Sequence, residues 1–147
     1  MRSVLWAPII AVFLAGAAFA APAPRDTLIV PGMRAGPVAL GMSPAELTAS
    51  VGVSGDMQHQ GPDTIYSWGD LAAQIGDKSP AVDLIMVNDP RYETADHVRV
   101  GLALLAVMAV LGDPDKTTTT PGTQTLDYDG MTLIIRNNVV AQIRVRK

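Results

Sequence analysis

The segment Gly101–Gly112, with the sequence GLALLAVMAVLG, places ten uncharged apolar residues between two glycines. This run is too short to span a bilayer, which needs about 20 residues. It instead predicts a buried helix that ends at a glycine. The segment Gly41–Gly52, GMSPAELTASVG, lies in the first half of the chain and has the same length and the same glycine boundaries. The sequence therefore predicts one structural unit that is present twice.

The earlier of the two predicted helices begins with strong capping signals. Ser43 is expected to cap the helix, Pro44 fits its first turn, and Glu46 completes a capping box with Ser43. The later helix has alanine at the matching positions, Ala103 and Ala106. We therefore expect a capping box only in the first helix.

Short apolar runs bounded by turn residues follow each helix and predict strands. The polar stretches 54–63 and 113–122 are expected to be loops. The predicted fold class is α+β, with two tandem αβββ repeats and both helices packed on one face of an antiparallel sheet. The predicted strands are residues 65–68, 71–75 and 82–87 in the first half, and 125–128, 131–136 and 139–145 in the second.

The predicted organisation is one compact domain behind a leader. The segments are a signal peptide at 1–20, a Pro/Ala tether at 21–27, a first repeat at 28–88, a linker at 89–96 and a second repeat at 97–147.

The N-terminal segment 1–20 has the features of a secretory signal. Arg2 precedes the apolar stretch Val4–Phe19, and Ala18-Phe19-Ala20 forms a small-residue cleavage site. We expect cleavage after Ala20, a periplasmic or secreted protein, and no stable membrane anchor afterwards. An uncleaved anchor is the alternative. The chain contains no cysteine, which excludes a cysteine-linked lipid, disulfides and thiol catalysis.

Charge and motifs argue against several functional classes. The formal net charge is −3 with a pI near 5.1, and the basic residues form no stripe, so nucleic-acid binding is not expected. The basic end formed by Arg144, Arg146 and Lys147 is interpreted as a solvated strand terminus. Neither His59 nor His97 has a metal-ligand partner at helical spacing. We predict no catalytic residues, no metal and no cofactor, and hence no enzyme.

One row of apolar side chains is the predicted partner-binding site. Alternation along a strand would place Val82, Leu84 and Met86 on one sheet face, with Ile134 nearby. The matching strand of the second half carries Gln142 and Arg144, which are polar. An apolar row in this position needs a cover, which is either a partner or the segment Leu28–Val30. The aromatic residues Tyr66 and Trp68 share one strand face and fit either core packing or a ligand platform.

Several short motifs resemble a known family. They are Gly41–Leu47 at the first helix, Leu111–Pro114 after the second helix, and Val139–Ile143 in the last strand. Together they resemble the SmpA/OmlA family of small outer-membrane assembly lipoproteins, and the pattern is also similar to the tandem-repeat fold of β-lactamase-inhibitor proteins. The chain departs from the first family by its missing cysteine and its doubled unit.

The resemblance implies a non-catalytic, protein-binding module of the bacterial cell envelope whose partner is another envelope protein. The alternative is an inhibitor of an envelope or secreted enzyme, with Asp115–Gly122 as the inserted loop. The identity of the partner and the oligomeric state stay open at this point.

Overall fold

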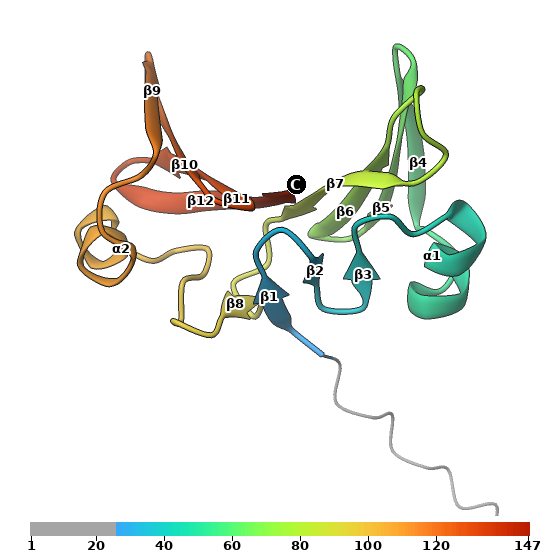
Figure 1. The fold of residues 1–147 in the computed structure, drawn as a ribbon, viewed down its shortest axis with the longest axis horizontal. Coiled ribbons are helices and arrows are strands. Elements are labelled where there is room, and N and C mark those ends of the chain that lie inside the picture. Colours follow the sequence, from blue (N-terminus) through green and yellow to red (C-terminus); the bar gives the residue numbers. More distant parts are fainter. Residues whose placement is uncertain (1–25) are drawn as a thin grey trace, which may run out of the picture.

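The computed structural model describes residues 26–147 and contains two β-sheets and two short helices (Figure 1). The predicted signal peptide and residues 21–25 of the predicted tether lie outside the described residues. The helices are α1 (Pro44–Val51) and α2 (Leu104–Leu111). The strands are β1 (Leu28–Val30), β2 (Arg34–Ala35), β3 (Val38–Ala39), β4 (Asp56–Gln60), β5 (Asp63–Trp68), β6 (Leu71–Ile75), β7 (Val82–Val87), β8 (Glu93–Thr94), β9 (Lys116–Thr120), β10 (Thr123–Tyr128), β11 (Met131–Arg136) and β12 (Val139–Arg146).

The large sheet is antiparallel and has eight strands in the order β4-β5-β6-β7-β12-β11-β10-β9. Each half of the chain contributes one four-stranded meander, and the two meanders join where β7 pairs with β12. In that junction Met86 lies opposite Arg144, Ile85 opposite Val145, and Val87 opposite Ile143. Since β7 and β12 are the last strands of their meanders and run antiparallel, the junction pairs equivalent strands as a two-fold axis would.

Matching hydrogen bonds recur in the two halves. The Gly41 N–H donates to the Val82 carbonyl at 2.8 Å, and the Gly101 N–H donates to the Val140 carbonyl at 2.7 Å. Trp68 Nε1 donates to the carbonyl of Gly52, the residue that follows α1. The Tyr128 hydroxyl donates to the carbonyl of Gly112, the residue that follows α2. Each helix end is therefore tied to the same strand of its own meander.

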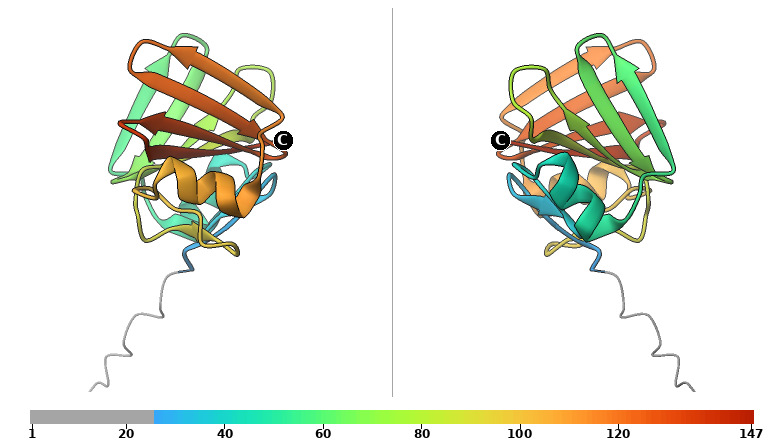
Figure 2. Two further views of the ribbon diagram at one scale, coloured as in Figure 1. Left: turned by 90° about the vertical axis from the view of Figure 1, so that its left-hand side faces the viewer. Right: turned by 90° about the vertical axis from the view of Figure 1, so that its right-hand side faces the viewer.

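The small sheet covers one face of the large sheet, which we call the core face. Its strand order is β3-β2-β1-β8, and β1 pairs with β2 in antiparallel and with β8 in parallel fashion. The two helices lie on the same side as the small sheet (Figures 1 and 2). A continuous apolar core joins these layers, and it includes Ile29 of β1, Leu47 of α1, Val107 of α2, Ile85 of β7 and Ile143 of β12.

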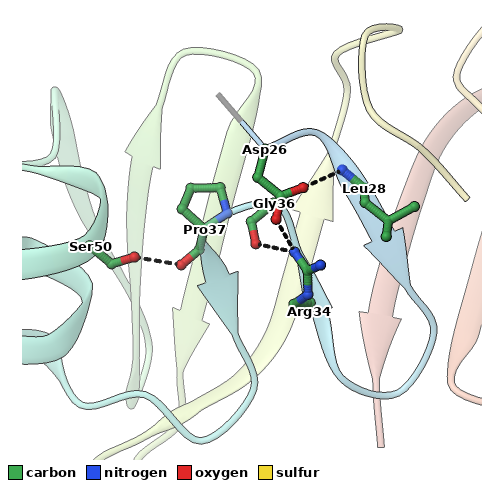
Figure 3. Close-up of polar contacts among 6 residues, drawn as sticks. All are labelled: Asp26, Leu28, Arg34, Gly36, Pro37 and Ser50. Atoms are coloured by element: carbon green, nitrogen blue, oxygen red, sulfur yellow. Dashed lines mark hydrogen bonds and ion pairs between the residues drawn. The ribbon is translucent and has the colours of Figure 1, made fainter. Parts of the chain in front are cut away.

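The N-terminal strands are fixed by a small polar cluster (Figure 3). The Asp26 carboxylate accepts hydrogen bonds from the Leu28 N–H and from Arg34, and Arg34 also donates to the Gly36 carbonyl at 3.0 Å. These bonds lower the pKa of Asp26, with the Leu28 N–H as the largest cause. The Ser50 hydroxyl of α1 donates to the Pro37 carbonyl at 2.7 Å, which attaches the helix to the small sheet.

The helices differ at their N-termini as their sequences predict. Ser43 accepts a hydrogen bond from the Glu46 N–H, and the Glu46 carboxylate accepts one from the Ser43 N–H. Ala103, at the same position before α2, has extended backbone angles and makes no side-chain cap. Because Ala103 lacks a side-chain oxygen, the Ala106 N–H lacks the acceptor that Ser43 provides for the Glu46 N–H, whereas the Leu104 N–H donates to the Asn138 carbonyl at 2.8 Å.

The prediction of an α+β fold with two αβββ repeats and helices packed on one sheet face is wrong. Strands hold 48% and helices only 13% of the described residues, and there are two sheets of four and eight strands. Each helix is short and buries a single residue, Leu47 in α1 and Val107 in α2. The small sheet also packs on the core face, and its two- and three-residue strands are too short to show a periodic pattern.

The two polar stretches that were expected to be loops form the outermost strands, β4 and β9. All residues of both strands are exposed, so neither face of these strands needs apolar side chains. The hydrophobic pattern that reveals a half-buried strand is therefore absent. In β9 a different signal was available, because four consecutive threonines, Thr117–Thr120, favour extended backbone.

Candidate functional site

The face of the large sheet opposite the core is the candidate site. It carries Leu84 and Met86 from β7, and Gln142 and Arg144 from β12, and we call it the trough. The outer strands β4 and β9 rise on either side of it, away from the helices (Figure 1). A cavity of about 590 Å³ lies in this face, and its lining reaches from Gln74 of β6 across the sheet to Thr125 of β10. Leu84, Asp127, Thr132, Arg144 and Arg146 also line it.

The structure places the four predicted partner-binding residues in different environments. Leu84 and Met86 lie in the trough and are half-buried. Ile134 pairs with Gln142 on the same face, but its side chain is only 6% exposed. Val82 belongs to the core cluster and is 3% exposed. Only Leu84 and Met86 of this set therefore offer apolar surface in the trough, and the binding role of all four residues stays a prediction.

A β-bulge explains the position of Val82. Gln74 pairs with Leu84, while the next residue, Ile75, pairs with Val82, so Asp83 has no partner in β6. This extra residue reverses the alternation, and Val82 joins the core face. The bulge has a counterpart in β12, where the register skips Ala141 and places Val140 in the core. Because strict alternation assumes an unbroken ladder, the sequence pattern assigned Val82 to the wrong face.

The segment Leu28–Val30, considered as a cover for the apolar row, lies elsewhere. It forms β1, and Ile29 is buried in the core cluster at 1% exposure. Leu84 and Met86 are outside that cluster, on the other face of the sheet. The trough floor is thus not covered by this strand.

Arg144 occupies the middle of the trough floor, between Met86 of β7 and Thr132 of β11. Its Nε donates to Gln142 Oε1 at 2.7 Å, and Gln142 Nε2 donates to Asn88 Oδ1 at 2.9 Å. This series of two hydrogen bonds fixes the plane of the Arg144 guanidinium group. Within residues 26–147, its two terminal nitrogens have no acceptor, so they can bind one from outside.

A second arginine of the trough is already neutralised. Arg146 donates to Asp127 Oδ1 at 2.8 Å, and the Thr132 hydroxyl donates to the same oxygen at 2.6 Å. The remaining acidic residue of the cavity, Asp83, lies at the bulge, with its carboxylate against Gly76. Of the two arginines in the trough, Arg146 is therefore paired with a carboxylate, and Arg144 is not paired with one among the described residues.

The sequence pattern alone did not indicate that Arg144 lies in the candidate site. Its position near the chain end, with Arg146 and Lys147, suggested a solvated strand terminus. The signal that could have identified it was the pairing of the two halves. If equivalent strands meet across a two-fold axis, Met86 and Arg144 must lie opposite each other at the centre of the sheet.

The aromatic pair Tyr66 and Trp68 packs against the core and does not line the trough. Their ring centroids are 6.5 Å apart in a stacked arrangement, and both residues flank the core cluster. The two histidines are exposed on separate elements, with His59 near Thr64 and His97 near Glu93. Among the described residues, no group of three or more His, Asp or Glu side chains is placed to hold a metal ion.

A second cavity, of about 440 Å³, lies on the core side between the end of α1 and the turn at Gly69–Asp70. The buried carboxylate of Asp89 lines it and accepts hydrogen bonds from Arg91 Nε, Nη2 and N–H. The Arg91 side chain holds the pKa of Asp89 below its ordinary value. The Asp89 carboxylate is therefore already paired with Arg91, and this ion pair fixes the segment before β8.

The comparisons with known proteins concern the fold. No family model matches the sequence, and no curated protein matches it. The chain is similar to a solved cysteine-rich secretory protein from Staphylococcus aureus, with a TM-score of 0.50 and 8% identity over 74% of this chain. This chain spans 44% of that protein. A DUF4309 family protein from Bacillus subtilis gives a TM-score of 0.48 at 10% identity, over 71% of this chain and 77% of that one.

The likeness to the Staphylococcus aureus protein concerns the fold and not the chemistry of a site, because the sequence identity is only 8%. On the question of membrane insertion, residues 26–147 contain no helix that is long and apolar enough to cross a bilayer.

Proposed function

We propose that this protein is an exported, non-catalytic module of the bacterial cell envelope that binds another envelope protein through the trough. The observation that carries the proposal is the composition of the trough floor. Half-buried Leu84 and Met86 lie beside an arginine whose terminal nitrogens have no acceptor in the described part of the chain. Apolar surface next to an oriented arginine is the usual composition of the centre of a protein interface.

The shape of the site also favours a protein over a small molecule. The cavity is a broad hollow whose lining residues come from β6, β7, β10, β11 and β12. Small-molecule sites generally enclose most of their ligand. An open hollow of this width instead fits an extended segment or a protruding loop. The signal-like pattern of residues 1–20 supports export to the envelope.

The alternative of an enzyme inhibitor has less support. It required Asp115–Gly122 to be a free loop that enters an active site. In the structure Lys116–Thr120 forms β9 and pairs with β10 at five consecutive positions. A strand held in this way offers only its exposed side chains and the short turn at its end.

The test is a pair of measurements on the variant Leu84→Ser. We expect this variant to melt close to the wild type and to retain less than a tenth of its partner from an envelope extract. Leu105→Ser is the matched control, because Leu105 is 84% exposed on α2, on the opposite side of the sheet. Equal partner recovery for both variants would contradict the proposal. Unfolding by Leu84→Ser would show that the trough floor is structural, and would contradict it as well.

A further inference from the structure

We infer that the trough recognises an acidic side chain, Asp or Glu, within an extended segment of its protein partner, and that Arg144 makes this contact. The inference rests on the proposed function and names the chemistry of the partner. It starts from the geometry of the guanidinium group. Because Nε donates its hydrogen bond to Gln142, the edge formed by the two terminal nitrogens is what remains for an incoming group. That edge matches a carboxylate, which can accept two parallel hydrogen bonds from it.

The guanidinium is held ready for this contact before any partner arrives. Asn88 holds the amide of Gln142, and Gln142 holds Nε of Arg144, so both the side chain and its plane are restrained. A donor that is already oriented loses less conformational entropy on binding than a free arginine side chain would. Gln142 and Asn88 are in this sense positioning residues, since they act through Arg144.

The charge of the trough floor indicates that the bound group is negatively charged. The chain as a whole carries a formal net charge of −3, yet the trough floor carries an arginine without a counter-ion among the described residues. The nearby Asp127 is already occupied by Arg146 and Thr132. Arg144 is also half-buried, so a carboxylate that reaches it is shielded from water and binds more strongly than at an open surface.

The neighbours of Arg144 define the rest of the segment. Met86 lies directly across from it and Leu84 follows along β7, so apolar side chains should flank the acidic one. The cavity continues on both sides of Arg144, towards Gln74 in one direction and Thr125 in the other. A segment that passes through, rather than a chain end that stops at Arg144, fits this continuity.

The probe is a short peptide with the sequence valine-serine-glutamate-serine-valine, acetylated at its N-terminus and amidated at its C-terminus, because an extended backbone places both valines on the same side as the glutamate. It is titrated into the 15N-labelled protein and followed by NMR. We expect the Arg144 Nε–H signal to shift, together with backbone amides of β7, β11 and β12. The same peptide with glutamine in place of glutamate should bind at least tenfold more weakly.

Variants separate recognition from structure. Arg144→Gln should weaken binding of the glutamate peptide at least tenfold while the rest of the spectrum keeps its wild-type dispersion. Gln142→Leu should weaken it less, because the guanidinium stays but is no longer held. Arg99→Gln is the control, since Arg99 is an exposed arginine paired with Glu93 outside the trough. It should bind like the wild type.

Four results would overturn the inference. Equal binding of the glutamate and glutamine peptides would show that the carboxylate is not read. Shifts confined to residues outside the trough would place the contact elsewhere. Binding only of a glutamine peptide with a free C-terminus would show that a chain end is recognised instead. If Leu84→Ser abolishes partner capture while the glutamate peptide fails to bind, the inference fails and the proposed function stands.

Discussion

Trp68 and Tyr128 make equivalent contacts in the two halves of the chain. The Trp68 indole N–H donates to the Gly52 carbonyl at 3.1 Å, and the Tyr128 hydroxyl donates to the Gly112 carbonyl at 3.0 Å. Each bond closes the end of a helix onto the second strand of the meander that follows it. An indole N–H and a phenol O–H thus make the equivalent contact in the two halves.

This relationship predicts a specific loss of stability. Tyr128→Phe removes the hydroxyl and should lower the free energy of unfolding by about 1 kcal/mol, because the Gly112 carbonyl loses its donor. Tyr66→Phe is the matched control, since the Tyr66 hydroxyl makes no hydrogen bond within residues 26–147. Denaturant melts of the two variants give the comparison. Equal losses would show that the Tyr128 bond is not stabilising.

The close approach of two turns gives a second prediction. The Gly32 N–H donates to the Gly130 carbonyl at 2.8 Å, and a Cβ at Gly130 would lie 2.4 Å from the Gly32 nitrogen. Gly130→Ala should therefore displace the turn between β1 and β2. Gly122→Ala is the control, because Gly122 has a similar φ of +75° but nothing within 4 Å of a Cβ.

The control should lose only the cost of the left-handed backbone, about 1–2 kcal/mol. Gly130→Ala should lose this amount and a further penalty for the displaced turn. Thermal melts of both variants measure the difference. Similar melting temperatures would mean that the small sheet adjusts to the added methyl group without loss.

The uncapped helix α2 gives a third prediction. Ala103 is exposed and already has the extended backbone of a capping residue, with φ of −66° and ψ of 143°. Ala103→Ser should therefore raise the free energy of unfolding by about 0.5–1 kcal/mol, and Ser43→Ala should lower it by about 1 kcal/mol. Denaturant melts measure both changes. A loss of stability in Ala103→Ser would show that the serine hydroxyl does not reach the Ala106 N–H.

The Asp89–Arg91 pair gives a prediction on pH. Hydrogen bonds from Arg91 hold the folded-state pKa of Asp89 below its ordinary value. The stabilisation by this carboxylate is therefore present above the unfolded-state pKa, about 3.9, and is lost as the pH falls through the lower folded-state value. The wild type should exceed Asp89→Asn in stability at pH 7, and the difference should shrink below about pH 4. A difference that does not change between neutral and strongly acidic pH would contradict this assignment.

Much of the local structure could be predicted from the sequence, but the way in which the strands and helices assemble could not. The boundaries of α1, its capping box and the runs that form β5 to β7 follow from residue patterns that act over a few positions. The fold class did not follow, because β4 and β9 are fully exposed and carry no apolar alternation. The strands of the small sheet are too short to carry a period at all, and they derive their stability from tertiary contacts.

In the candidate site, too, local patterns placed some residues correctly, whereas the positions of others depend on how distant strands pair. Leu84 and Met86 were identified by alternation, which holds as long as the ladder is regular. Val82 was misplaced because the bulge at Asp83 depends on how β6 and β7 pair. Arg144 was overlooked because its place at the centre of the sheet depends on the pairing of β7 with β12, which joins strands from opposite halves of the chain.

The central claim, that the trough binds a protein partner, is tested most directly by site-specific photo-cross-linking. A benzophenone amino acid replaces Met86 on the trough floor in one variant and Leu105 on exposed α2 in another, and cells expressing each variant are irradiated. We predict a discrete higher-mass adduct from position 86 and none from position 105. An adduct from position 105 with none from position 86 would contradict the claim.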